Sequence, residues 1–235
     1  MSPRLRIGMI LASRNTVAEP DAYAMLPAGV TMHTTRLHLV EPDPVAMKKM
    51  TEDSEQAAAL LASAEVGLIV FHCTAASTID ADMGRKVAER IERGTGVPAT
   101  ATSEALVAAL RTLKARKIVM LSPYPQAVND AEVAFFAHHG IEVIREAGFL
   151  PPKGEGSPSA EPEEWYRRTL AMRMPEADAY FLSCTNIRAV GAIDALERDL
   201  RKPVISSNQA MIWHCLRKGG VKDSVPGFGR LLGVH

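Results

Sequence analysis

Two cysteines occupy matching positions in the two halves of the chain. Cys73 opens a Cys-Thr-Ala-Ala-Ser segment and Cys184 opens a Cys-Thr-Asn segment, each after an apolar run typical of a buried strand. A thiolate at a strand end is stabilised by the N–H groups and the dipole of the helix that follows. The same donors bind carboxylates. A single free cysteine is usually a small buried hydrophobe, but two in matching contexts predict two reactive thiols facing one site.

The third cysteine, Cys215, lies in a helical pattern over residues 209–217 and shares its apolar face, which indicates core packing. No Cys-x-x-Cys or His-x-x-x-His spacing occurs in the sequence, so we expect no metal site. Three widely separated cysteines fit a reducing compartment better than a disulfide framework, and this favours a cytoplasmic location.

Composition narrows the range of partners. The 235 residues are 47% hydrophobic, enough to bury a full core, and 27 lysines and arginines balance 27 aspartates and glutamates. Without a basic excess there is no electrostatic footprint for nucleic acid. The first apolar run, residues 7–12, is too short for a signal peptide or a membrane span. We therefore expect a small-molecule partner, with no nucleic acid and no membrane.

Strand-like and helical patterns alternate along the whole chain. The β-branched apolar runs are at about 5–11, 30–40, 66–71, 97–101, 117–121, 141–146, 179–182 and 203–205. Strands separated by helices pair in parallel through right-handed crossovers, and ligand sites then lie at the carboxyl ends of the strands. Both Cys-Thr steps occupy such ends.

The sequence also repeats itself at an offset of about 105 to 111 residues, since the segment from Val97 resembles that from Lys202 and the two cysteines are 111 positions apart. One duplication explains these matches. We predict an N-terminal lobe over 1–116, a C-terminal lobe over 117–205, and a helix and tail over 206–235 that pack back on the N-terminal lobe.

The segment from Gly148 to Glu163 carries four prolines and several charges, which predicts an irregular loop. Its length fits either a lid over the site or a surface excursion.

Five short motifs follow one another along nearly the whole chain. They are Ala12-Ser13-Arg14-Asn15-Thr16, His72-Cys73-Thr74-Ala75-Ala76-Ser77, Ser122-Pro123-Tyr124, Ser183-Cys184-Thr185-Asn186 and Ser206-Ser207-Asn208-Gln209-Ala210. Together they resemble the maleate cis–trans isomerase and arylmalonate decarboxylase branch of the aspartate/glutamate racemase superfamily. The resemblance implies an α/β fold of two pseudo-symmetric lobes, each a parallel sheet flanked by helices, with the active site in the cleft between them. It also implies no metal, nicotinamide or pyridoxal cofactor, a small carboxylate substrate, and a homodimer or higher homo-oligomer.

The resemblance assigns roles by position. Cys73 resembles the nucleophile of maleate isomerases and one acid/base of racemases, whereas Cys184 resembles the proton donor of the second lobe. The implied substrate-binding residues are Asn15 and Tyr124 through their side chains and Thr74, Ala75, Thr185 and Asn186 through their N–H groups. A carboxylate whose α-carbon becomes carbanionic needs such donors.

The reaction implied first is the cofactor-independent cis–trans isomerisation of maleate or a related enedioate, by addition of the Cys73 thiolate with Cys184 as acid/base. The same cysteines fit a cofactor-independent racemase of an amino acid or derivative, although the turn after the first strand lacks that group's acid. Decarboxylases of the family have glycine where Cys73 stands, which disfavours decarboxylation. A dicarboxylate-binding protein would gain little from two oxidisable thiols.

Three residues beside the motifs each allow two interpretations. Arg14 is either a surface residue or the ligand of a second carboxylate. His72 precedes Cys73, and because neighbouring residues on a strand point to opposite faces, we expect it to be packed or hydrogen-bonded beneath the site. Asn208 is either a cap and support or a pocket donor.

Overall fold

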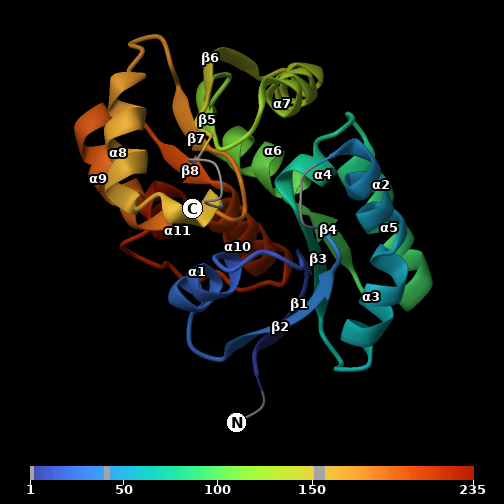
Figure 1. The fold of residues 1–235 in the computed structure, drawn as a ribbon. Coiled ribbons are helices and arrows are strands. Elements are labelled where there is room, and N and C mark those ends of the chain that lie inside the picture. The colour runs from blue at the N-terminus through green and yellow to red at the C-terminus, as the bar shows by residue number, and fades with distance from the viewer. Residues whose placement is uncertain (1–2, 40–42, 151–156) are drawn as a thin grey trace.

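The computed structural model describes residues 3–39, 43–150 and 157–235, and it forms two parallel four-stranded sheets. The first contains β1 (Leu5–Ala12), β2 (Val30–Leu37), β3 (Leu68–His72) and β4 (Ala99–Ala101) in the order β2-β1-β3-β4. The second contains β5 (Lys117–Ser122), β6 (Glu142–Gly148), β7 (Ala179–Leu182) and β8 (Val204–Ser206) in the order β6-β5-β7-β8. Each strand falls on a predicted run, and the identical order confirms two similar lobes (Figure 1).

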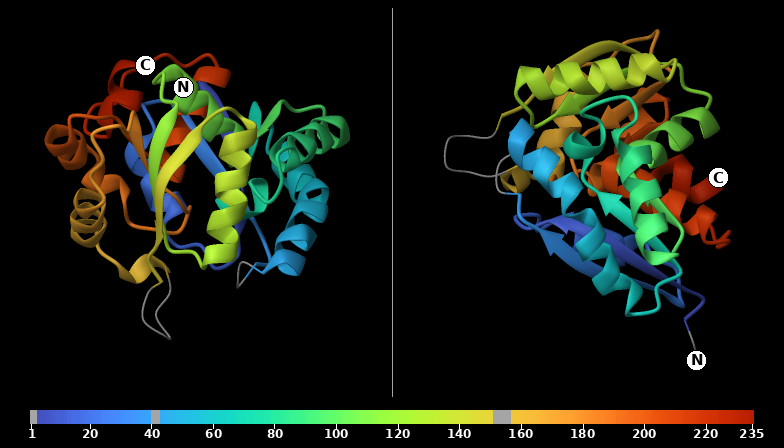
Figure 2. Two further views of the ribbon diagram at one scale, coloured as in Figure 1. Left: turned by 90° about the horizontal axis from the view of Figure 1, so that it is seen from above. Right: turned by 90° about the vertical axis from the view of Figure 1, so that its right-hand side faces the viewer.

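Helices connect the strands on both sides of each sheet. They are α1 (Ala18–Met25), α2 (Pro44–Glu52), α3 (Ser54–Ala62), α4 (Thr74–Ser77), α5 (Met83–Thr95), α6 (Thr102–Thr112), α7 (Gln126–His138), α8 (Pro162–Ala171), α9 (Ile193–Leu200), α10 (Ser207–Lys218) and α11 (Gly229–Val234), with 3-10 turns η1 (Ser157–Ser159) and η2 (Val190–Ala192). Helices α6 and α10 pack against each other in the middle of the molecule, whereas α3 and α5 lie on one outer side and α8 and α9 on the other (Figures 1 and 2).

The hydrophobic core consists of two clusters, because the side chains along each strand point alternately to opposite faces of the sheet. Ile7 and Met9 of β1 pack in one cluster with α1, α6 and α10, whereas Ile10 packs in the other with α2, α3 and α5. In the second lobe, Met120 and Leu121 divide in the same way. Because successive side chains of a strand point to opposite faces, the inner strands β1, β3, β5 and β7 are largely buried on both sides, as their nearly continuous apolar runs predict, whereas the edge strands β2 and β6 are more exposed.

The C-terminal segment divides between the lobes. Helix α10 contacts α1, α6 and β3 of the first lobe and β8 of the second. Helix α11 differs from the prediction, because it packs on β8 and α9 of the second lobe. There the N–H groups of Gly229 and Arg230 donate to Asp194 and Glu197 of α9, and these bonds fix the start of the helix.

The predicted loop over 148–163 is shorter in the structure. Strand β6 runs to Gly148, η1 covers 157–159 and α8 starts at Pro162. Residues 151–156, the centre of the suggested lid, lie outside the described residues.

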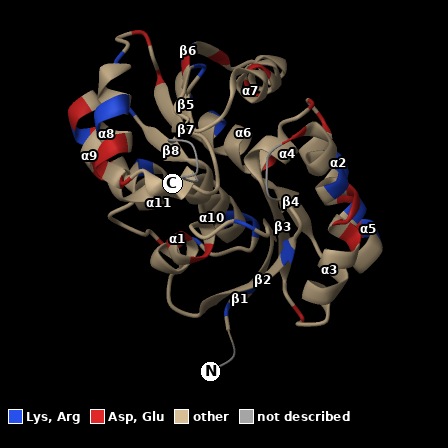
Figure 3. Cartoon of the chain, in the orientation of Figure 1, with Lys and Arg blue, Asp and Glu red and all other residues tan. Residues whose placement is uncertain are grey.

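Both signs of charge alternate on the outer helices α5, α8 and α9 (Figure 3). Within the described ranges, no helix is long and apolar enough to cross a membrane.

Candidate active site

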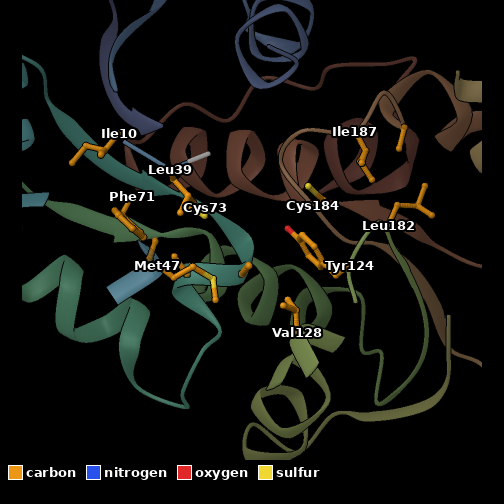
Figure 4. Packing of buried hydrophobic residues seen from close by; sticks show 14 of the residues in the cluster. Ile10, Leu39, Met47, Phe71, Cys73, Tyr124, Val128, Leu182, Cys184 and Ile187 are labelled. Atoms are coloured by element: carbon orange, nitrogen blue, oxygen red, sulfur yellow. The ribbon is translucent and has the colours of Figure 1, made fainter. Parts of the chain in front are cut away.

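The two cysteines lie at equivalent strand ends, one in each lobe. Cys73 follows β3 and starts the turn into α4, and Cys184 lies two residues after the end of β7. Each is 6% exposed, and both belong to one buried cluster with Tyr124. Figure 4 shows the two residues on either side of the space between the lobes, with Tyr124 beside Cys184. We call this arrangement of Cys73, Cys184 and Tyr124 the two-thiol site.

Burial dominates the ionisation of Cys73. The N–H of Ala76 in α4 donates to its sulfur, as the predicted strand-to-helix turn implies, and this bond lowers the pKa of the thiol. Removal from water outweighs that donor and raises the pKa of Cys73 to about 11. The strand-to-helix turn thus supplies the predicted donor to the thiolate, but the thiol is neutral at pH 7.

Cys184 has a strained backbone and several partners. Its φ of +122° lies in the region that favours glycine, which costs a non-glycine residue about 1–3 kcal/mol. Its N–H donates to Ser207 Oγ at 3.2 Å, and its sulfur accepts from the N–H of Asn186 at 3.3 Å. Burial raises the pKa of Cys184 to about 12 against these donors. The strain is therefore held at a residue predicted to be catalytic.

Tyr124 supplies a hydroxyl donor to the second thiol. Its side chain is 7% exposed, and burial raises its pKa well above the usual value, so the phenol keeps its proton. That proton is donated to Cys184 sulfur, which favours the thiolate form of Cys184. The backbone of Tyr124 is held by a bond from its N–H to Ser122 Oγ at 3.1 Å.

The Asn15 turn of the first lobe is bonded to the Cys184 turn of the second. Asn15 Nδ2 donates to Thr185 Oγ1 at 2.9 Å, and Asn15 Oδ1 accepts from Val17 and Ala18 at the start of α1. The N–H of Thr16 donates to Asn186 Oδ1 at 3.0 Å. The structure thus brings Asn15, Thr185 and Asn186 together, and their contact with substrate stays a prediction.

The Thr74 turn of the first lobe is tied to α10. Thr74 Oγ1 donates to Ser207 Oγ at 2.8 Å, and Ser207 Oγ also accepts from Cys184. One hydroxyl at the start of α10 therefore joins both cysteine turns. The side chains of Thr74 and Ala75 are buried around it, and binding of a carboxylate by their N–H groups stays a prediction.

His72 lies beneath the site, as expected. It is fully buried, with Nδ1 2.9 Å from Thr102 Oγ1 and Nε2 2.9 Å from Asn208 Oδ1. Asn208 Nδ2 in turn donates to Asp21 at 2.7 Å, so Asn208 supports His72. Burial lowers the pKa of His72 to about 4, so that it is neutral at pH 7. Arg14 is exposed.

A hollow of about 560 Å³ opens beside the Asn15 turn. Its lining includes Thr16 and Asp21 from the first lobe and Arg188 from the second. The hollow therefore borders Thr16, the last residue of the first motif, and Arg188, two positions after the end of the fourth.

Glu132 was missed by sequence reasoning. It lies on α7, is fully buried, and accepts a hydrogen bond from Ser183 Oγ at 2.9 Å. Burial raises its pKa to about 8, and its charge acts on both thiols and on Tyr124. The sequence does contain a signal for the burial of Glu132. It lies four residues after Val128 and three before Phe135, which places an acid on the apolar face of the helix. Across the described ranges, no group of three or more His, Cys, Asp or Glu residues could hold a metal ion.

The chain has two similar parallel α/β lobes, each with a cysteine at the equivalent strand end. It is therefore of the class of proteins in which a two-thiol site lies between two similar lobes. The maleate isomerase of Geobacillus stearothermophilus is 26% identical over 247 residues, which cover 99% of this chain and 98% of that relative. The crystal structure of a maleate isomerase from Pseudomonas putida superimposes with a TM-score of 0.92 at 26% identity, covering 98% of both chains. The arylmalonate decarboxylase of Bordetella bronchiseptica is 31% identical over 153 residues, 60% of each chain.

Residues 7–232 match the family model described as arylmalonate decarboxylase. The chain belongs to this family, as the five motifs predict.

Proposed function

We propose that this protein is a cofactor-independent cis–trans isomerase of maleate or a closely related enedioate. The observation that carries the proposal is the two-thiol site, in which Cys73 and Cys184 from pseudo-equivalent strands lie within one buried cluster. Similarity to maleate isomerases along nearly the whole chain supports the same reaction. A cysteine-to-alanine variant of one such relative, 26% identical, was solved with maleate.

In the proposed reaction Cys73 is the nucleophile. Its thiolate adds to one alkene carbon, the C–S bond forms as the π bond breaks, and the electron pair moves onto the neighbouring carboxylate as an enediolate. The former double bond is now single and rotates. The N–H group that already contacts Cys73, that of Ala76, stabilises the thiolate before addition and after expulsion.

Cys184 carries the proton in this scheme. It protonates the enediolate carbon, and after rotation it removes that proton so that the thiolate of Cys73 is expelled and the trans alkene forms. When Cys184 is deprotonated, its charge is held by the hydroxyl of Tyr124 and the N–H of Asn186. The N–H groups of Thr74, Ala75, Thr185 and Asn186, with the side chains of Asn15 and Tyr124, are the proposed carboxylate contacts. The Tyr124 hydroxyl and the Asn186 N–H, which have one proton each, donate to the carboxylate while Cys184 is a neutral thiol.

Proton NMR of the reduced protein with maleate in deuterated buffer tests the proposal. A fumarate vinyl signal should grow, and both Cys73→Ser and Cys184→Ser should lower its rate at least about a thousandfold, because each removes a reacting group. Cys215→Ala is the matched control, since Cys215 is buried on α10 outside the two-thiol site and its loss should leave turnover intact.

The alternative outcome of the same experiment is racemase chemistry. If no fumarate forms, and the α-proton of an amino acid derivative exchanges in a reaction that depends on both cysteines, the protein is a racemase rather than an isomerase. Binding of a dicarboxylate that survives both cysteine substitutions, with no turnover in the wild type, would instead indicate a binding protein.

We further propose that the protein works in the cytoplasm as a homodimer or larger homo-oligomer. Three free cysteines support the reducing compartment, and the family resemblance supports the assembly. Light scattering after size-exclusion chromatography measures the assembly directly, and a monomer mass would contradict it.

A further inference from the structure

Glu132 is the one acid named above that lies buried against the two-thiol site without a role in the proposed reaction. Its Oε1 accepts from Ser183, whose own N–H donates to Leu121 at the end of β5 at 2.8 Å. Ser183 directly precedes Cys184, the residue with the strained φ. Glu132 is therefore hydrogen-bonded to the turn that sets the position of the second thiol.

The other carboxyl oxygen of Glu132 indicates its protonation state. Oε2 is buried and has no hydrogen-bond partner among the described residues. An ionised carboxylate that is buried and only half satisfied is very costly, whereas a carboxylic acid in the same place is tolerated. The geometry alone thus favours a neutral side chain, and burial correspondingly raises the pKa of Glu132 to about 8.

The titratable groups that face Glu132 come from three strand ends. They are Cys73 after β3, Cys184 after β7 and Tyr124 after β5, and the charge of Glu132 raises the pKa of each of them. On its own helix, Asn129 bonds Glu146 of β6, and His139 at the helix end bonds the carbonyl of Ala81. The negative charge of an ionised Glu132 would therefore oppose both the formation of the thiolates and the binding of a dianionic substrate.

We propose that Glu132 is a positioning residue of the two-thiol site. As a neutral acid it holds the Ser183–Cys184 turn, and loss of its proton suppresses thiolate formation at Cys73 and Cys184. The inference rests on the proposed function for its substrate, but its effect on the thiols is independent of any substrate. It predicts an upper limit to activity on the alkaline side. Without that limit, thiols of high pKa would keep gaining reactivity as the pH rises.

The variant Glu132→Gln separates charge from hydrogen bonding, because glutamine still accepts from Ser183 and never ionises. In the wild type, kcat/KM for maleate should rise with pH and level off near pH 8. In Glu132→Gln it should continue to rise about tenfold per pH unit to pH 9.5, as expected for thiols that titrate higher. Asp130→Asn, on the exposed side of the same helix, is the matched control and should keep the wild-type profile.

Alkylation by iodoacetamide without substrate gives the second measurement, with peptide mapping to follow Cys73 and Cys184 separately. The alkylation rates should level off near pH 8 in the wild type and continue upward in Glu132→Gln. Unchanged alkylation and activity profiles, or a uniform loss at every pH, would overturn the proposal. If the wild type does not turn over maleate, the proposed function fails, and the alkylation profiles still decide the role of Glu132.

Discussion

The hydroxyl of Tyr124 and the sulfur of Cys184 form a hydrogen bond inside a buried cluster, and the N–H of Asn186 is a second donor to the same sulfur. A hydrogen bond is stronger in such surroundings than in water. Because the phenol keeps its proton over the whole working pH range, its effect falls on the thiolate form of Cys184 alone. Tyr124 thus assists the step in which Cys184 gives up its proton.

Tyr124→Phe tests this assistance. Loss of a hydrogen bond to a charged group is worth about 1.5–3 kcal/mol, so kcat for maleate should fall roughly ten- to a hundredfold while the fold is kept. The solvent-exchange rate of the bound intermediate's proton should fall in parallel. An unchanged kcat would remove Tyr124 from the proton-transfer step.

His72 makes the unfolding free energy sensitive to acid. Its folded pKa of about 4 lies below the ordinary value of 6.5, so the unfolded chain binds the extra proton between these values. The stability contributed by neutral His72 is present above pH 6.5 and is lost as the pH falls toward 4.

The variant His72→Gln measures that contribution. At 1.36 kcal/mol per pH unit, the titration of His72 lowers the unfolding free energy of the wild type by about 2 kcal/mol between pH 6.5 and pH 5. The variant should lack this part of the decline in unfolding free energy. Urea unfolding at the two pH values gives the comparison. Burial raises the pKa of Asp21 to about 6, which changes the unfolding free energy with the opposite sign, so the difference between wild type and variant is the quantity to compare.

At the scale of elements, β6 and the turn after β5 are in close contact at Gly148. A Cβ at this position would lie 2.4 Å from the carbonyl oxygen of Tyr124, which leaves no room for a side chain. The end of β6 therefore packs directly on the backbone that carries the Tyr124 hydroxyl.

Gly148→Ala should consequently lower both stability and activity. The backbone of Tyr124 has to move, at a cost of about 1–3 kcal/mol for an overpacked site, and the hydroxyl moves with it. Gly94→Ala is the matched control, since Gly94 is an exposed position of α5 and no atom lies within 4 Å of a Cβ added there. Alanine at this position should stabilise by roughly 0.5–1 kcal/mol. Thermal unfolding and kcat give both answers; equal behaviour of the two variants would contradict the packing argument.

The elements were predictable because their signals are local. Runs such as residues 66–71 and 179–182 are apolar and β-branched or aromatic, and helical patterns separate them, so all eight strands could be located. The strand ends then located both cysteines. The high pKa values of the thiols and the partners of Glu132 and His72 were not predictable, because they depend on residues 30 to 136 positions apart that meet only in the folded chain.

At the scale of the whole molecule, each of the two core clusters contains residues of both lobes. Helices α6 and α10 pack together between the sheets, and Ser207 of α10 bonds Thr74 of one lobe while accepting from Cys184 of the other. We propose that the boundaries at 116 and 205 mark repeated units of structure rather than units that fold alone.

Unfolding should therefore be a single cooperative event. Far-ultraviolet circular dichroism reports all helices, and the fluorescence of the buried Trp165 and Trp213 reports α8 and α10. The two signals should change at the same temperature or urea concentration. Separate transitions would mean that one lobe unfolds before the other.

Helix α10 also dictates the order in which the chain can finish folding during synthesis. It covers the face of the first sheet that carries Ile7 and Met9, yet it is made about a hundred residues after that sheet's last strand. At a ribosomal rate of about 5–20 residues per second, that face is covered by α1 and α6 alone for several seconds before α10 is made. We therefore expect the first lobe to complete its apolar core only when α10 docks, after nearly the whole chain has been made.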